Sequence, residues 1–193
     1  MNLPNKLTVA RIIATPVFLL FMMLDFKGHY VVALVIFIAA ALTDLFDGKI
    51  ARKRGIVTDF GKFLDPVADK MLTTAAFLAF LNEKDGFFGM VWIVFIVLLR
   101  EFLVTSVRLV AASSGGKVIA ANIWGKAKTV SQMVAIIFTI AVMAFVGLFP
   151  AFPVLNAILY VSASVALWIS TVLCAVSGAV YLVQNGEFIK SAK

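Results

Sequence analysis

Six long apolar stretches alternate with short polar breaks along the chain. Each stretch is close to the about 20 residues that a helix needs to cross a bilayer. The breaks contain the residues that usually end helices, including Gly28, Gly86, Gly115 and the pair Pro150 and Pro153. We therefore expect six transmembrane helices, at Leu7–Leu24, His29–Arg52, Gly61–Asn82, Phe87–Ala112, Trp124–Leu148 and Phe152–Gln184.

Composition supports a membrane protein. Of the 193 residues, 63% are hydrophobic and 14% are charged, whereas a soluble domain is about 45–50% apolar and about 25% charged. A single cysteine excludes a disulfide scaffold. The sequence shows no repeat or accessory segment, so residues 1–193 are expected to form one all-α, membrane-embedded domain.

The basic residues predict the orientation. In a soluble protein the net charge of +7 would suggest nucleic-acid binding; here it indicates cytoplasmic loops that face anionic membrane lipid and acidic substrates, with no nucleic-acid partner. With both termini in the cytoplasm, the outer loops hold only Lys27 and Lys84. The inner ends hold Lys6, Arg11, Lys49, Arg52, Lys53, Arg54, Lys62, Lys70, Arg108, Lys117, Lys126, Lys128, Lys190 and Lys193.

Four aspartates interrupt the second and third stretches. The uncharged parts, Tyr30–Thr43 and Met71–Asn82, have 14 and 12 residues, too few to cross a core of about 30 Å at about 1.5 Å per residue. The aspartates are therefore drawn into the cytoplasmic side of the membrane domain, where ionised groups face a cavity or a partner. They are Asp44, Asp47, Asp65 and Asp69.

The spacing of the aspartates predicts a metal site. Each pair is three or four residues apart and so shares one helix face. Four carboxylates converging on one volume cannot all stay ionised without cations, and all-oxygen ligands favour Mg²⁺ or Mn²⁺. Small residues beside the metals and a nearby Arg52 suit a diphosphate. In the alternative, the aspartates pair only with the basic residues of the intervening loop.

The spacing also carries a family resemblance. The pattern Asp44-x2-Asp47-Gly48-x2-Ala51-Arg52-x8-Gly61-x3-Asp65-x3-Asp69 resembles, at all eight positions, the signature of the CDP-alcohol phosphotransferases. The resemblance implies a cytosol-facing polar cavity, two divalent metals held by the four aspartates, a CDP-linked lipid substrate and a homodimer. It also implies that Gly48, Ala51 and Gly61 leave room for the nucleotide, that Arg52 supports its phosphates, and that Asp69 is the general base for an attacking alcohol that displaces CMP.

The acceptor alcohol is indicated by other segments. Residues 2–11, 100–108 and 125–129 are similar to the phosphatidylglycerophosphate synthase branch of that family, whose acceptor is sn-glycerol 3-phosphate and whose lipid donor is CDP-diacylglycerol. Basic residues around the cytoplasmic connection between the fourth and fifth spans suit an acceptor phosphate, namely Arg108, Lys117, Lys126 and Lys128. Alternatively, they form an ordinary basic loop against anionic lipid, and the acceptor is phosphatidylglycerol or inositol phosphate.

The first stretch offers further candidates. Asn5, Thr8 and Arg11 lie on one side of the expected helix and are similar to family residues near the nucleotide and phosphates, with Arg11 also a candidate for the acceptor phosphate. A helix cap and an interfacial anchor are the alternative roles.

Arg100 and Glu101 fall within the fourth span. Because adjacent residues on a helix do not face each other, each is expected to have its own partner. Glu101 shares a face with Thr105 and Arg108, which directs it toward the acceptor region; an interhelical ion pair is the alternative.

Two other classes compete with this interpretation. A membrane prenyltransferase also uses aspartate pairs, but it would lack the Gly48-x2-Ala51-Arg52 element. A cation-coupled transporter would show broken helices and repeated halves.

Overall fold

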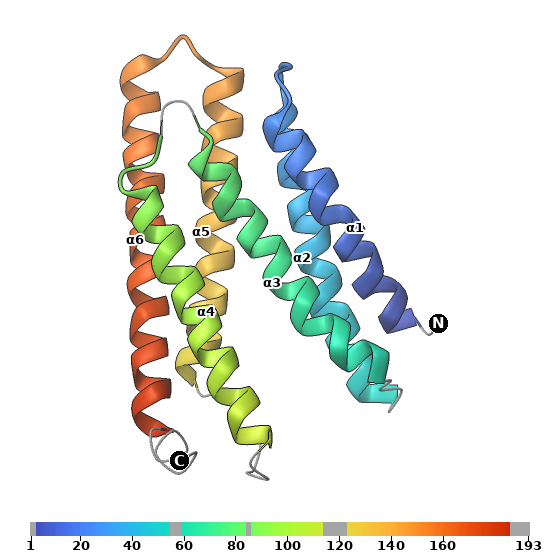
Figure 1. The fold of residues 1–193 in the computed structure, drawn as a ribbon. Coiled ribbons are helices and arrows are strands. Elements are labelled where there is room, and N and C mark those ends of the chain that lie inside the picture. The colour runs from blue at the N-terminus through green and yellow to red at the C-terminus, as the bar shows by residue number, and fades with distance from the viewer. Residues whose placement is uncertain (1–2, 55–58, 84–85, 114–122, 186–193) are drawn as a thin grey trace.

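The computed structural model describes residues 3–54, 59–83, 86–113 and 123–185, with the backbone alone at 3–4, 44–54, 59–63, 65–66, 69 and 111–113. These residues form six helices and no strand (Figure 1). The six predicted helices are confirmed, each within a few residues of its expected ends. The helices are α1 Leu3–Met23, α2 His29–Arg54, α3 Asp59–Leu81, α4 Met90–Ser113, α5 Ile123–Leu148 and α6 Pro153–Gln184.

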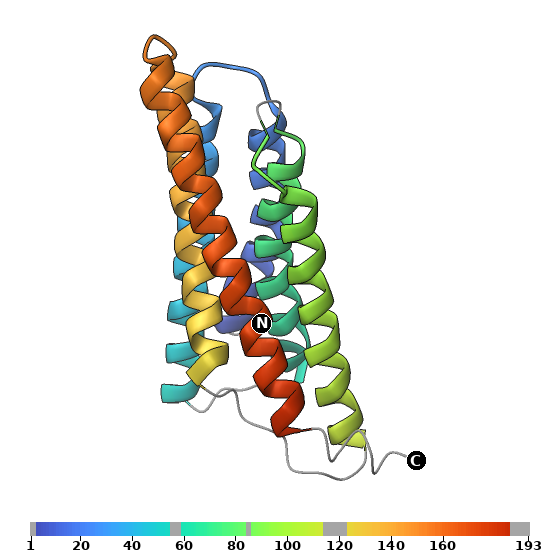
Figure 2. The ribbon, with the colours of Figure 1, turned by 90° about the vertical axis from the view of Figure 1, so that its left-hand side faces the viewer.

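The helices run alternately up and down a single bundle (Figures 1 and 2). Helices α1, α3 and α5 begin, and α2, α4 and α6 end, at what we call the lower end, as drawn in Figure 1. Short connections join them at the upper end, around Gly28, Gly86 and Pro150. The described segments that are predicted to carry the site therefore lie toward the lower end.

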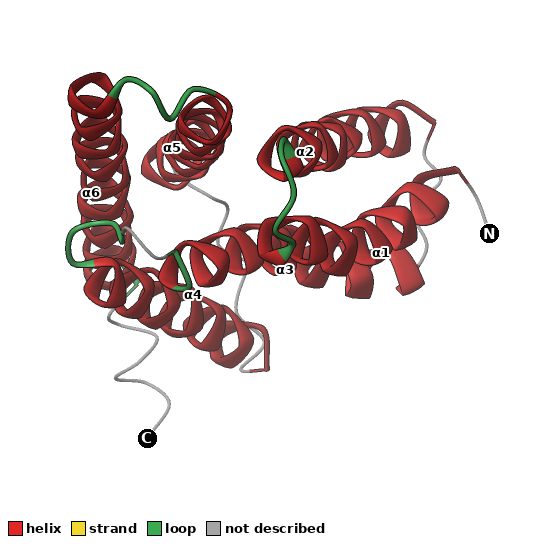
Figure 3. Ribbon diagram, turned by 90° about the horizontal axis from the view of Figure 1, so that it is seen from above, coloured by secondary structure: helices red, strands yellow, loops and turns green. Residues whose placement is uncertain are grey.

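Two groups of three helices make up the bundle, as the view from above shows (Figure 3). Helix α1 packs against α2 and α3, while α6 packs against α4 and α5. Contacts of α5 with α2 and α3, and of α3 with α4, join the groups. Large apolar side chains fill the interior, among them Phe37, Phe77, Phe80, Ile136 and Leu167.

Apolar side chains also cover the outside of the bundle. Val91, Phe102 and Val154 are 69–73% exposed, as expected where lipid rather than water surrounds a helix. Two buried threonine hydroxyls are satisfied within their own helices: Thr139 donates to the Ala135 carbonyl at 2.8 Å and Thr171 to that of Leu167 at 2.8 Å. Apolar side chains thus fill the interior of the bundle and also cover its outer surface.

Four of the described helices are long and apolar enough to cross a membrane, namely α1, α4, α5 and α6. In α2 and α3 the apolar parts are shorter, His29–Thr43 and Lys70–Leu81. This agrees with the argument that polar segments of these two helices are carried into the membrane domain. None of the six helices is broken within the described residues, which is not the pattern that a transporter of the expected kind would show.

The start of helix α4 is attached to the middle of α6. The indole Nε1 of Trp168 donates to the Phe88 carbonyl at 2.9 Å. At Gly89, φ is +66°, and a Cβ there would lie 2.8 Å from Trp168 Cζ2, so glycine alone fits the turn into α4. This contact fixes where α4 starts, and hence the level at which its polar residues meet α5 and α6.

Candidate active site

The backbone places the four aspartates on neighbouring helices. Asp44 and Asp47 lie on the lower part of α2, and Asp65 and Asp69 on the first turns of α3. The two helices contact each other. The side chains of these aspartates, and of Gly48, Ala51, Arg52 and Gly61 in the same signature, lie outside the described residues. Among the side chains that are described, no group of three or more His, Cys, Asp and Glu residues is gathered to hold a metal, so the aspartate site stays a prediction.

Helix α1 contributes three buried polar residues beside the aspartate helices. Asn5, Thr8 and Arg11 are 6%, 1% and 2% exposed, and each interacts with another residue. Among the described residues, α1 contacts only α2 and α3. The three residues share one face of the helix, as expected, and that face is buried, whereas an interfacial anchor would be exposed. Arg11 therefore lies with the aspartate helices and away from the basic residues of α4 and α5.

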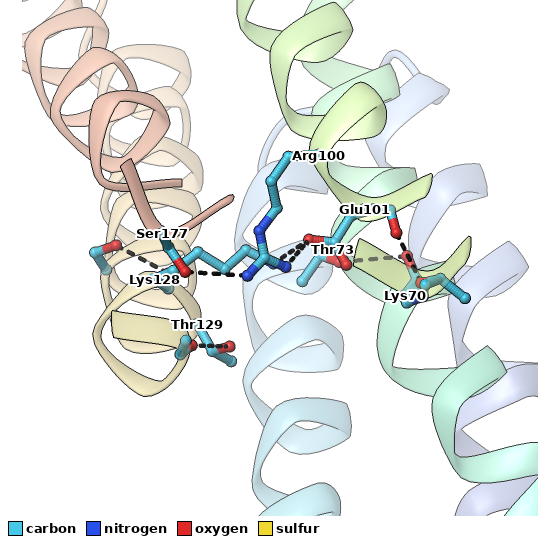
Figure 4. A network of polar contacts seen from close by, with 10 residues as sticks. Lys70, Thr73, Arg100, Glu101, Lys128, Thr129 and Ser177 are labelled. Atoms are coloured by element: carbon cyan, nitrogen blue, oxygen red, sulfur yellow. Dashed lines mark hydrogen bonds and ion pairs between the residues drawn. The ribbon is translucent and has the colours of Figure 1, made fainter. Parts of the chain in front are cut away.

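A polar network joins α4, α5 and α6 in the lower half of the bundle (Figure 4). Glu101 Oε1 accepts hydrogen bonds from Arg100 Nη1 at 3.0 Å and from Lys128 Nζ at 2.5 Å. Arg100 Nη2 donates to Ser177 Oγ at 3.0 Å. One carboxylate oxygen thus links two cations, and one of these cations reaches the third helix.

This network confirms one expectation and adds a contact that was not expected. Arg100 and Glu101 each have a partner of their own, Ser177 and Lys128, and they also bond to each other. The added contact is possible because the Arg100 side chain is long enough to curve back to its neighbour while its second nitrogen stays on Ser177. Glu101 makes the interhelical ion pair with Lys128, the alternative to a direct role in binding the acceptor.

Helix α3 brings one more cation to the network. The Lys70 ammonium donates to the Thr105 hydroxyl, which in turn donates to the Glu101 carbonyl at 2.7 Å. Lys70 follows Asp69 directly in the sequence. The network therefore reaches helix α3 at the residue that follows the last aspartate of the signature.

The predicted basic cluster divides into residues with different surroundings. Lys128 is 9% exposed and paired, whereas Lys126, two residues earlier on α5, is exposed. Arg108 on α4 is exposed, and its guanidinium carbon lies 5.4 Å from the centre of the Tyr181 ring. Lys117 lies outside the described residues.

Several residues of this region were missed by the sequence analysis. They are Gln132 on α5, and Ser177, Gly178 and Tyr181 on α6. Gln132 Nε2 and the Tyr181 hydroxyl are buried and, within the described part of the chain, have no hydrogen-bond partner. The sequence held one signal for them: in otherwise apolar spans, Gln132 lies one helical turn from Lys128, and Tyr181 lies one turn from Ser177.

A groove of about 530 Å³ opens between α1, α3 and α4. Its walls are mostly apolar, and its lining also includes Lys70 and Thr105 of the polar network. It therefore joins an apolar surface of the bundle to the polar network. The lining residues are Thr15, Leu19, Val67, Lys70, Met71, Thr74, Ala75, Leu78 and Thr105.

Comparison with known proteins gives one consistent family. The CDP-diacylglycerol–glycerol-3-phosphate 3-phosphatidyltransferase of Bacillus subtilis is 38% identical over 203 aligned positions, covering 99% of this chain and 98% of the relative. A protein of the same name from Rickettsia bellii is 35% identical over 182 positions, covering 93% of each chain. One from Arabidopsis thaliana is 36% identical over 179 positions, covering 86% of this chain and 76% of the relative. Residues 1–176 match the CDP-alcohol phosphatidyltransferase family as a whole, and with the intact eight-residue signature this establishes that the chain belongs to that family.

Proposed function

We propose that this protein transfers the phosphatidyl group of CDP-diacylglycerol to sn-glycerol 3-phosphate, giving phosphatidylglycerol phosphate and CMP. The observation that carries the proposal is the similarity over nearly the full length to a relative named for this reaction. The basic residues on α4 and α5 support an acceptor that bears a phosphate. We place the lower end of the bundle at the cytoplasmic face, because that end carries the excess of basic residues.

The donor set fits a pair of hard divalent ions. Asp44, Asp47, Asp65 and Asp69 offer only carboxylate oxygens, and they lie on two helices that contact each other. Oxygen ligands of this kind suit Mg²⁺ or Mn²⁺. When bound, such ions neutralise the charge of a diphosphate and of the transferred phosphoryl group.

The reaction itself needs one base and good positioning. Asp69 takes the proton from the attacking hydroxyl of the acceptor as the new oxygen–phosphorus bond forms. The bond between that phosphorus and the oxygen of CMP breaks, and CMP leaves. Gly48, Ala51 and Gly61 leave space for the nucleotide.

Other residues hold the nucleotide phosphates from two sides. Arg52 on α2 supplies a guanidinium, which binds phosphate oxygens in a bidentate manner. Asn5 and Thr8 approach from α1, where they are buried against the aspartate helices.

The apolar groove between α1, α3 and α4 suits an acyl chain of the lipid donor. A CDP-diacylglycerol molecule in the membrane must reach the aspartates from the side, and this groove runs from apolar walls to Lys70, which follows Asp69 in the sequence. Lipid would then enter laterally while the water-soluble acceptor enters from the lower end, beside Arg108, Lys126 and Lys128.

Arg108→Ala is expected to raise the KM for glycerol 3-phosphate about tenfold or more, since a hydrogen bond to a charged group contributes about 1.5–3 kcal/mol. The KM for CDP-diacylglycerol should change little. Initial rates of CMP release at varied concentrations of each substrate measure both constants. Lys27→Ala, at the upper end, is the matched control. An effect confined to CDP-diacylglycerol would contradict the placement of the acceptor.

A competition experiment tests the acceptor. Purified protein in mixed micelles receives CDP-diacylglycerol and Mg²⁺ together with glycerol 3-phosphate, inositol phosphate and phosphatidylglycerol in equal amounts. Mass spectrometry of the lipids should find phosphatidylglycerol phosphate as the product. Phosphatidylinositol phosphate or cardiolipin as the main product would keep the chemistry but contradict the proposed acceptor.

A further inference from the structure

We infer that Glu101 is a positioning residue, which holds the Lys128 ammonium at the acceptor-phosphate site and is itself held from α6 through Arg100, Ser177 and Gly178. The inference rests on the proposed function in one respect: Lys128 is taken to bind the phosphate of the acceptor. Glu101 touches no substrate in this account and acts through its two cationic partners.

The geometry gives Glu101 a central place. Its Oε1 atom accepts from both Lys128 on α5 and Arg100 on its own helix, at 2.5 and 3.0 Å (Figure 4). Arg100 continues to Ser177 on α6. Three helices are therefore connected at one level through a single carboxylate, so loss of its charge would release Lys128 and Arg100 together.

Helix α6 is shaped to receive Arg100. A Cβ atom on Gly178 would lie 2.7 Å from Arg100 Cγ and 3.7 Å from its Cβ. Because Cγ belongs to the base of the side chain, a methyl group at 178 would force the whole Arg100 side chain onto another path. The neighbouring Ser177 supplies the hydroxyl that Arg100 Nη2 binds. Gly178 thus leaves space for the base of the Arg100 side chain, and Ser177 binds its guanidinium; we call this pair the seat on α6.

Burial explains why Lys128 needs a fixed partner. Lys128 is 9% exposed in an apolar helix, whereas Lys126 is exposed. Removing one partner of a buried ion pair leaves the other without a compensating charge. Without Glu101, the Lys128 side chain would turn toward water, and its ammonium would no longer be held in one position.

The charges of the network leave room for an anion. Among the described side chains, three cations (Lys70, Arg100 and Lys128) interact with the carboxylate of Glu101, and a fourth, Arg108, lies close enough to Lys70 to repel it. Three positive charges therefore remain, which suits the dianion of a phosphate monoester. Glu101 fixes the positions of Lys128 and Arg100, and its single negative charge leaves the network positive.

Phosphate binding tests the inference without relying on catalysis. Isothermal titration of the purified protein with inorganic phosphate should show binding to the wild type and affinity at least tenfold weaker for Glu101→Gln, which keeps the shape but loses the charge. Glu83→Gln is the matched control, since Glu83 accepts a hydrogen bond from Tyr30 at 2.8 Å near the upper end. Equal phosphate affinity in wild type and Glu101→Gln, or no binding to the wild type, would overturn the inference.

Steady-state kinetics separate positioning from a general structural role. Glu101→Gln should raise the KM for glycerol 3-phosphate at least tenfold, with the KM for CDP-diacylglycerol and kcat at saturating acceptor within about threefold of wild type. A parallel loss in all three constants would contradict positioning. Weakened phosphate binding by Glu101→Gln in a protein that releases no CMP would reject the proposed function and keep this inference.

Gly178→Ala probes the seat on α6. It should weaken phosphate binding at least threefold because it displaces Arg100. The control is Gly147→Ala, whose Cβ would meet nothing nearer than Tyr30 Cδ2 at 3.6 Å. Both changes interrupt the same link, which runs from Lys128 through Glu101 and Arg100 to α6. The double variant Glu101→Gln/Gly178→Ala should therefore bind phosphate no more weakly than Glu101→Gln alone. Fully additive losses would show two independent effects and overturn the link through Arg100.

Discussion

Asp69→Asn is expected to lower kcat by about 10²–10⁴-fold, the usual contribution of a general base. The amide cannot take the proton of the acceptor hydroxyl, although it keeps the size of the carboxylate and one oxygen. Because three aspartates of the signature remain, the affinity for CDP-diacylglycerol should fall much less than kcat. Single-turnover CMP release and binding of the lipid donor, measured on the same preparation, separate the two effects.

The control for Asp69→Asn is Asp25→Asn. Asp25 is an exposed aspartate between α1 and α2, so the chemical change is the same while the site is left intact. Its kcat should stay within about twofold of wild type. Equal losses of donor binding and turnover in Asp69→Asn would show that this residue serves as a ligand and not as the base.

Removal of divalent metal is expected to abolish activity and to lower the thermal stability of the protein. Four carboxylates on two contacting helices repel one another unless cations lie between them. At a Mg²⁺ concentration about 100 times Kd, binding contributes about 2.7 kcal/mol, which corresponds to an increase in Tm of roughly 5–10 °C for a chain of this size. Thermal unfolding in detergent, with and without EDTA, measures the shift.

Ionic strength must be separated from specific binding in this experiment. NaCl at the same ionic strength as the MgCl₂ should leave Tm near the EDTA value. The variant Asp44→Asn/Asp47→Asn should lose most of the Mg²⁺-dependent shift, because two of the four ligands lose their charge. A Tm and an activity that do not respond to Mg²⁺ or Mn²⁺ would contradict the metal site.

The six helices could be predicted because the hydrophobic pattern and the helix-ending residues agree at most boundaries. In a membrane, backbone groups must be satisfied within the helix, so few alternatives compete with the pattern. Helix α1 is the instructive difference: it begins at Leu3, before the apolar run that starts at Leu7. Pro4 does not prevent this, since a proline is tolerated in the first turn, where no backbone donor is needed.

The polar network between helices was less accessible to sequence reasoning. Spacing along one helix shows which residues share its face, and this predicted the grouping of Glu101, Thr105 and Arg108. It does not show which face meets a neighbouring helix at the same level, so Ser177 was not found as the partner of Arg100. Long flexible side chains add a second difficulty, because Arg100 reaches its own neighbour Glu101.

The composition of the basic cluster does not predict which of its residues are buried. Lysines near a cytoplasmic connection look alike in the sequence, yet Lys128 is buried in an ion pair and Lys126 is exposed. Residues two positions apart lie on different sides of a helix, so the division followed from geometry that charge counting ignores. The chemistry at a site thus depends on which of several similar residues the packing turns inward.

CMP release is the most direct test of the central claim, that the aspartate helices and the basic residues of α4 and α5 form one phosphatidyltransferase site. Purified protein is supplied with CDP-diacylglycerol, and CMP is measured with glycerol 3-phosphate and Mg²⁺ together, with each alone, and with neither. The account predicts release only when both are present, with phosphatidylglycerol phosphate formed in equal amount. Release without the acceptor, or none under any of the four conditions, would contradict it.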